Sequence, residues 1–269
     1  MIERRALFLA GGMALVWGLL DPIEPPRAAE VASNPAASEV LRVLGEGVIG
    51  PAQSTRALGD PAAFARWEPG EWNYRITAGP RQGKTEREIL APITVTSRGE
   101  TWERTIGQEY TLYLRRTPDG GLLMASELAH AYNVFVLFEP PLSYLIPGLQ
   151  AGERRVFDGR MEIHSSRRQG AKLYSGRIQA TTVFAGVYRV TTPAGTFNAA
   201  LIRTDYQIDV LALVSVKDTL YTFYAEGVGK VAEVEHRQIL AAVFGTDTKT
   251  GKVLVSFRPA SPPTRIEAP

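Results

Sequence analysis

The sequence predicts a mainly β protein whose antiparallel sheet curls into a half-barrel or a barrel. Between residues 67 and 244, short stretches rich in Val, Ile, Thr, Tyr and Phe alternate with turn signals such as the one at Thr117 to Gly121. The connections are too short for helical crossovers, so successive strands must pair antiparallel. Neither a glycine-rich phosphate loop nor a regular alternation of strands with helices occurs. A long meander must bury one face and protect its edges, which favours a curved or closed sheet.

The composition argues against a nucleic-acid interface and excludes sites that need cysteine. The chain has 269 residues, enough for one sizeable core, and a formal net charge of +2. Its basic residues are interleaved with acidic ones, as between Arg81 and Glu88, a pattern typical of a solvated strand face and not of a nucleic-acid interface. It contains no cysteine, which excludes disulfides, thiolate nucleophiles, thiolate metal sites and a lipidated cysteine.

The N-terminus predicts export. Arg4 and Arg5 precede an apolar run from Ala6 to Leu20, which is shorter than the roughly 20 residues of a membrane span. Residues 1–29 therefore resemble an export signal of the twin-arginine type, and we expect a periplasmic or cell-envelope location. Cleavage after Ala29 would leave Arg27 where a small residue is usual, so an uncleaved signal anchor is the alternative. Membrane contact is expected only through this segment.

The rest of the chain divides into three parts. Residues 30–66 form a spacer rich in Ala, Pro and Gly, with one short helix expected from Ser38 to Leu44. Residues 67–244 form the antiparallel β domain. Residues 245–269 are expected to hold one strand, Lys252 to Phe257, followed by a Pro-rich tail.

The β domain opens on a Pro-Gly turn at Pro69 and Gly70, which leads into an aromatic alternating strand. Further strands are expected at 86–97, 102–114, 122–127, 132–138, 153–166, 173–184, 187–192, 196–209, 218–225 and 228–240. Residues 140–152 are interpreted as the main irregular connection, which could plug one mouth of the curved sheet.

Four short motifs occur in a fixed order: Pro69 to Tyr74, Leu149 to Glu153, Thr192 to Ala199 and Tyr224 to Val231. In this order they resemble the TapB-like family of exported bacterial proteins, over about residues 67–238. The resemblance implies a curved sheet similar to that of the lipoprotein-carrier half-barrels, and it carries over no catalytic residue. The motif residues best explained as structural turns are Pro69, Gly70, Pro193, Gly195, Gly227 and Gly229.

The titratable residues form no catalytic pattern. His130, His164 and His236 lie far apart, without a neighbour at metal-ligand spacing. Glu233 and Glu235 are interpreted, together with His236, as a polar strand face. No Gly-x-Ser-x-Gly elbow occurs. We therefore expect a protein that is not an enzyme and that has neither a metal site nor a cofactor.

Binding is the remaining class of function. Two apolar segments could line or cover a groove for a lipid or another amphipathic ligand, through Leu142, Tyr144, Leu145, Ile146, Leu149, Ile208, Val210, Leu211 and Leu213. Trp67, Trp72 and Trp102 could stack on a sugar or lipid, although packing in the core is the favoured interpretation. The alternative is a structural or assembly protein of the cell envelope that acts through contacts with another envelope protein.

Overall fold

The structure is a computed structural model that describes residues 39–53, 64–96, 99–167, 170–210, 214–241 and 244–259. These residues form thirteen strands and short 3₁₀ helices. The elements are η3 (Glu39–Leu44), β1 (Ile49–Ala52), β2 (Gly70–Ala78), β3 (Thr85–Thr96), β4 (Gly99–Ile106), β5 (Tyr110–Arg116), β6 (Leu122–Ala129), η5 (His130–Tyr132), β7 (Val134–Leu145), β8 (Arg154–Ser165), β9 (Lys172–Thr192), β10 (Gly195–Val210), β11 (Val214–Ala225), β12 (Gly229–Ala241) and β13 (Phe244–Pro259).

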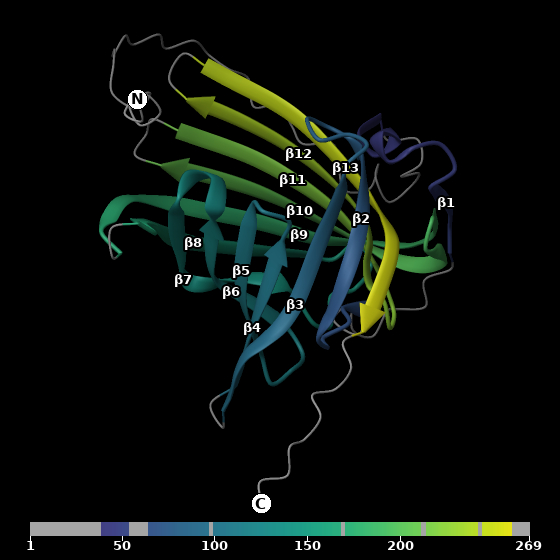
Figure 1. Cartoon of the computed structure of the whole chain (residues 1–269), viewed down its shortest axis with the longest axis horizontal. Coiled ribbons are helices and arrows are strands. Elements are labelled where there is room, and N and C mark those ends of the chain that lie inside the picture. Colours follow the sequence, from purple (N-terminus) through teal and green to yellow (C-terminus); the bar gives the residue numbers. More distant parts are fainter. Residues whose placement is uncertain are drawn as a thin grey trace, which may run out of the picture.

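The sheet closes into a barrel (Figure 1). From β2 onward each strand pairs antiparallel with the next, and β13 returns to pair with β2. Twelve of the thirteen strands form this ring, while β1 lies outside it against β9. The mainly β, antiparallel prediction is confirmed. The half-barrel alternative is wrong, because β8 pairs with β9 and leaves no open edge between the two halves of the ring.

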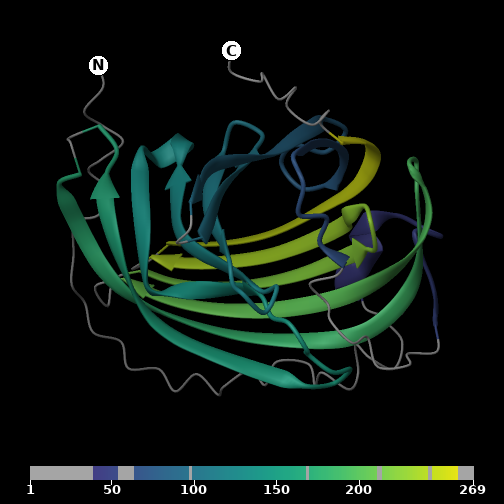
Figure 2. The same ribbon diagram turned by 90° about the horizontal axis from the view of Figure 1, so that it is seen from below.

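The longest strands bend around the barrel, as the green ribbons of Figure 2 show. The sequence suggests two strands with a turn at Gly186, but β9 runs unbroken through it. Gly186 has a φ of +126°, and the register with β10 skips one residue between Leu201 and Ile202. A bulge of this kind bends a strand and increases its twist, so the expected turn is a bend inside one strand.

The connection expected at residues 140–152 is shorter than predicted. Strand β7 continues to Leu145, and Leu142 pairs with Met124 of β6. The two prolines, Pro140 and Pro141, fall where the ladder between β6 and β7 is interrupted. Proline has no N–H group to donate to a neighbouring strand. A strand tolerates it at a bulge because no ladder hydrogen bond is needed there.

Both ends of the described chain pack on the barrel. The helix expected in the spacer is the 3₁₀ helix η3, whose six residues are too few for a stable α-helix. Its Leu41 and Leu44 are each 2% exposed in the main core cluster, and η3 contacts β2, β12 and β13. The tail strand is longer than predicted, since β13 begins at Phe244 and closes the ring. No helix among these residues has the length and apolar character needed to cross a membrane.

The turn between β11 and β12 depends on glycine. Gly227 has a φ of +71° and Gly229 a φ of +92°. A Cβ at Gly227 would meet nothing within 4 Å, so any cost of a side chain there comes from the backbone alone.

Replacing Gly227 with Ala is expected to lower the free energy of unfolding by about 1 kcal/mol, because other residues rarely adopt this left-handed conformation. Urea denaturation measures the change. The matched control is Gly245→Ala in β13, where the new Cβ would lie 3.6 Å from its nearest neighbour and the backbone stays extended. Equal stability of the two variants would show that the turn does not require glycine.

Candidate functional site

A network of charged side chains fills the middle of the barrel. It joins strands that are not neighbours in the ring, through Glu86 and Glu88 of β3, Arg104 of β4, Lys230 and Glu233 of β12 and Lys252 of β13. Residues two apart on a strand share a face, which is why Glu86 and Glu88 both point inward. Three carboxylates meet three buried cations here, and the more exposed Arg81 also pairs with Glu86.

Glu88 is the centre of this network and has no exposed surface. Its carboxylate accepts hydrogen bonds from Arg104 Nε at 2.9 Å and Lys252 Nζ at 2.9 Å, and Lys230 Nζ lies 2.7 Å away. Burial alone would raise the pKa of Glu88, but the charges of Arg104, Lys230 and Lys252 outweigh it and hold the pKa well below its ordinary value. Glu88 is therefore ionised at any physiological pH.

Glu233 completes the network. Lys230 Nζ donates to it at 3.1 Å and Lys252 Nζ lies 3.0 Å away; against the effect of burial, these two charges lower the pKa of Glu233 to about 2. Both ammonium groups also lie near the ring of Tyr74, 5.3 and 5.4 Å from its centroid. Each charge of the network thus has a partner of opposite sign.

A second cluster has unbalanced charge. Arg237 lies against three carboxyl groups: it bonds Asp218 at 2.8 Å, contacts Glu235, and is near Glu127. It also donates to the hydroxyl of Tyr110 at 3.1 Å. Burial raises the pKa of Glu127 to about 7, with Arg237 opposing it, and burial together with the charge of Asp218 raises the pKa of Glu235 to about 7. This part of the barrel is sensitive to pH near neutrality.

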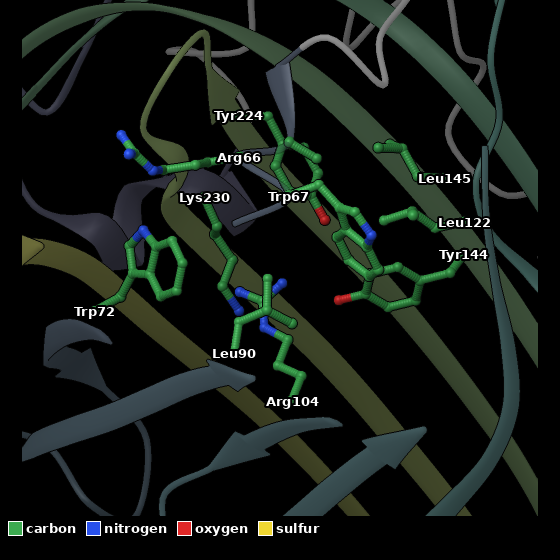
Figure 3. Close-up of a pocket in the computed structure, with 12 residues that line it drawn as sticks. Arg66, Trp67, Trp72, Leu90, Arg104, Leu122, Tyr144, Leu145, Tyr224 and Lys230 are labelled. Carbon is green, nitrogen blue, oxygen red and sulfur yellow. The ribbon is translucent and has the colours of Figure 1, made fainter. Parts of the chain in front are cut away.

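One end of the barrel carries an open hollow, which we call the mouth. It has a volume of about 360 Å³ and is lined by Ala65, Arg66, Trp67, Glu68, Arg116, Gly120, Leu122 and Gly227. Behind it lies a recess of about 20 Å³, close to the space needed for one water molecule. Figure 3 shows the recess, where Lys230 and Arg104 extend toward one another below Trp67.

The mouth is held in place by named contacts. Arg66 donates to the carbonyl oxygen of Gly227 at 2.8 Å and to Glu68 at 2.6 Å, which ties the segment before β2 to the β11–β12 turn. The ring of Trp67 packs on Trp102, with 5.3 Å between centroids. The two rings are tilted by 47°, and because Trp102 belongs to the core, this contact anchors the Trp67 indole against the core.

Two buried N–H groups at the mouth have no partner among the described residues: Arg66 Nε and Trp67 Nε1. Figure 3 shows the indole nitrogen of Trp67 on the side of Leu122, which lines both the mouth and the recess. Arg116 is exposed and forms no ion pair with any other described residue. Buried donors are nearly always satisfied in proteins, and these two N–H groups lack such a partner among the described residues.

The predicted ligand-binding residues fall in different places. Leu142, Leu145 and Leu149 are 1%, 3% and 1% exposed and pack in the core, and Ile146 is half-buried. Tyr144 and Leu145 line the recess. The remaining residues belong to the second segment: Ile208 and Val210 pack on the main core cluster, while Leu211 and Leu213 lie outside the described residues. Leu142, Tyr144, Ile208 and Val210 thus contact one core cluster, and the groove itself stays a prediction.

The remaining sequence candidates are accounted for by local contacts. His130 lies 2.8 Å from Thr111, His164 lies 3.2 Å from Glu162, and His236 lies 2.8 Å from Asp247. No group of His, Asp and Glu in the described part of the chain is arranged to hold a metal ion. Trp72 and Trp102 are 4% and 6% exposed core residues, whereas Trp67 is half-buried at the mouth.

Comparison with solved structures gives distant likenesses. A lipoprotein candidate from Parabacteroides distasonis is 12% identical, with 73% of this chain and 98% of that chain covered and a TM-score of 0.36. A candidate exported protein with a YmcC-like fold from Bacteroides fragilis is 14% identical, with 72% and 98% covered and a TM-score of 0.42. The hypothetical lipoprotein YmcC from Escherichia coli is 10% identical, with 73% and 89% covered and a TM-score of 0.33.

No family model and no curated protein matches the chain. The resemblance to the TapB-like family therefore stays a prediction from the four turn motifs.

Proposed function

We propose that the chain is an exported protein of the cell envelope that binds a small ligand at the mouth of its barrel and catalyses no reaction. Export is supported by Arg4 and Arg5 and the apolar run from Ala6 to Leu20. Membership of the TapB-like family, as the turn motifs suggest, accords with the same location.

The observation that carries the binding proposal is the mouth itself. Its volume of about 360 Å³ falls within the range of about 300–1,000 Å³ typical of small-molecule sites. It combines an aromatic face, Trp67, with two guanidinium groups, Arg66 and Arg116. By contrast, the recess behind it holds about 20 Å³, and Lys230 in its lining belongs to the buried charge network. We therefore place the ligand at the mouth instead of deep in the barrel.

The lining of the mouth favours binding over catalysis. Among the described residues of its lining, the ionisable side chains are Arg66, Glu68 and Arg116. None of the lining residues offers the nucleophile and base in hydrogen-bond contact that hydrolytic chemistry requires. Glu68 is already bonded to Arg66.

The binding proposal is tested on the exported protein labelled with 5-fluorotryptophan. Titration with a library of small polar fragments should shift the ¹⁹F resonance of Trp67, which is assigned by its loss in Trp67→Phe. The resonance of Trp72, whose Nε1 is bonded to Val228 O at 2.7 Å, should respond less. Fragments that bind without moving the Trp67 resonance would overturn the assignment of the mouth, as would a library without a hit. A stable complex with an envelope protein alongside the latter result would favour the alternative assembly role.

Export itself gives a separate prediction. Replacing Arg4 and Arg5 together with Lys should leave the precursor in the cytoplasm, because twin-arginine signals are recognised through the arginine pair. Cell fractionation and immunoblotting measure the distribution, with Arg27→Lys as the control of equal charge. Unchanged export of the double variant would contradict the twin-arginine assignment.

A further inference from the structure

We propose that the second charged cluster is a proton-dependent clamp, which holds two opposite walls of the barrel together while it is protonated and releases them as its protons leave. The clamp consists of Tyr110, Glu127, Asp218, Glu235 and Arg237. The proposal goes beyond the proposed function and does not depend on a ligand at the mouth.

The clamp joins strands that lie on opposite sides of the ring. Four strands separate β6 from β11 in one direction around the ring, and four separate β12 from β5 in the other. Arg237 of β12 nevertheless donates to the hydroxyl of Tyr110 of β5 at 3.1 Å, across the interior. The mouth adjoins the β11–β12 turn at Gly227, whereas Asp218 and Arg237 lie further along these two strands. The clamp therefore links the two walls away from the mouth.

The clamp contains more carboxyl groups than its one cation can neutralise. Arg237 bonds Asp218 at 2.8 Å and contacts Glu235. Glu127 is near Arg237 but forms no ion pair with any described residue. With all three carboxyl groups ionised, the clamp would have three negative charges against one positive charge. Two protons make it neutral, because Arg237 then balances the remaining carboxylate.

Burial makes the excess negative charge costly and gives a proton a place. The side chain of Asp218 is 6% exposed, and its Oδ1 has no hydrogen-bond partner among the described residues when the neighbouring carboxyl groups are ionised. Glu235 lies within hydrogen-bonding reach of Asp218. Two carboxyl groups form a hydrogen bond only when one of them carries a proton. A proton shared by Asp218 and Glu235 thus replaces repulsion with a bond.

The pKa shifts of the clamp agree with this geometry. Burial raises the pKa of Glu127 to about 7, and burial together with the charge of Asp218 raises the pKa of Glu235 to about 7. Because both values are raised from the ordinary 4.5, the contribution of the clamp is fully present below about pH 4.5 and is lost as the pH rises through 7. The protons pass to water, and the carboxylates left behind repel one another.

The other groups that face the clamp do not offset this charge. Burial raises the pKa of Tyr110 of β5 and of Tyr206 of β10 above the ordinary value, so both stay neutral. Glu233 of β12 is ionised, and its charge contributes to the raised pKa of Glu235. On β13, the residues paired with Glu235 and Arg237 are the uncharged Thr250 and Thr248.

The test measures the distance between the two walls in the full exported chain, which contains no cysteine. Spin labels are attached through Ala131→Cys, just after β6, and Lys217→Cys on β11, both at exposed positions. Pulsed electron paramagnetic resonance is recorded between about pH 5 and about pH 9, two units on either side of the expected transition. We expect a single short distance at low pH and a longer distance that gains population with a midpoint near pH 7.

Two double variants identify the groups that titrate. Glu127→Gln with Glu235→Gln imitates the protonated clamp at every pH and should keep the short distance over the whole range. Glu139→Gln with Glu226→Gln makes the same change of charge at exposed positions outside the clamp and should leave the midpoint unchanged. The labelled chain without these substitutions gives the first result even if a variant does not fold.

Three outcomes would overturn the proposal. The first is a distance that does not change with pH. The second is a transition that keeps its midpoint in Glu127→Gln with Glu235→Gln. The third is a longer distance accompanied by loss of the far-ultraviolet circular dichroism signal, since the chain would then unfold as a whole instead of releasing the clamp.

Discussion

Replacing Glu88 with Gln is expected to lower the free energy of unfolding by about 3–5 kcal/mol, the cost of breaking a buried ion pair by removing one partner. The carboxylate is fully buried and contacts Arg104, Lys230 and Lys252. Its loss leaves three buried cations with the two carboxylates of Glu86 and Glu233. The shape of the side chain is kept, so the effect isolates the charge.

Urea denaturation at pH 7 measures this loss. The matched control is Glu71→Gln on the neighbouring strand β2, where Glu71 pairs with Arg87 on the surface. That pair is partly exposed, at 29% and 58% of the side-chain surface, and we expect little change. Equal effects of the two substitutions would contradict the view that the network organises the interior of the barrel.

Replacing Glu127 with Gln is expected to stabilise the protein at pH 8 and to have little effect at pH 4. Burial raises the pKa of Glu127 from its ordinary 4.5 to about 7, so the folded state binds a proton that the unfolded state releases between these two values. Stability is therefore fully present below about pH 4.5 and is lost as the pH rises toward 7. Gln imitates the protonated form at every pH and removes this loss.

The size of the effect follows from the pKa. A rise from 4.5 to about 7 corresponds to about 3 kcal/mol, and we expect about 2 kcal/mol because Glu127 keeps part of its surface in water. Denaturation curves between pH 4 and pH 8 measure it, with Glu226→Gln in the exposed β11–β12 turn as the control. A stability difference that does not change with pH would contradict a protonated Glu127 in the cluster with Glu235 and Arg237.

Local sequence signals predicted the class of fold. The alternation within each strand and the turn residues indicated an antiparallel sheet that curls, and glycines such as Gly227 occupy left-handed positions. Closure of the ring was not decided by these signals, because it depends on the pairing of β8 with β9 and of β13 with β2. The second of these joins strands from opposite ends of the chain.

The sequence did not indicate that the charged residues of the network lie inside the barrel. Glu86 and Glu88 lie in a stretch of alternating charges that is typical of a solvated strand face, and Glu233 was assigned to a polar surface as well. Lys252, which binds both glutamates of β3, lies 166 and 164 residues away from them in sequence. A charged residue is stable in a barrel only when such a partner is present, and no local pattern reveals it.

The mouth was only partly foreseen. Trp67 was considered as a stacking residue, but Arg66 and Arg116 were not considered. They come from the segment before β2 and from the end of β5, and only the closed barrel brings them to one hollow. An arginine next to a half-buried tryptophan just before a Pro-Gly turn is the one signal in the sequence that could have pointed there.

The central claim is that the protein binds a small ligand at the mouth of the barrel. Native mass spectrometry of the exported protein, purified from cells under mild conditions, tests it most directly. We predict the mass of the protein alone or with a small polar ligand. A retained molecule in the mass range of a phospholipid would contradict the account, because neither the recess of about 20 Å³ nor the mouth of about 360 Å³ can enclose two acyl chains.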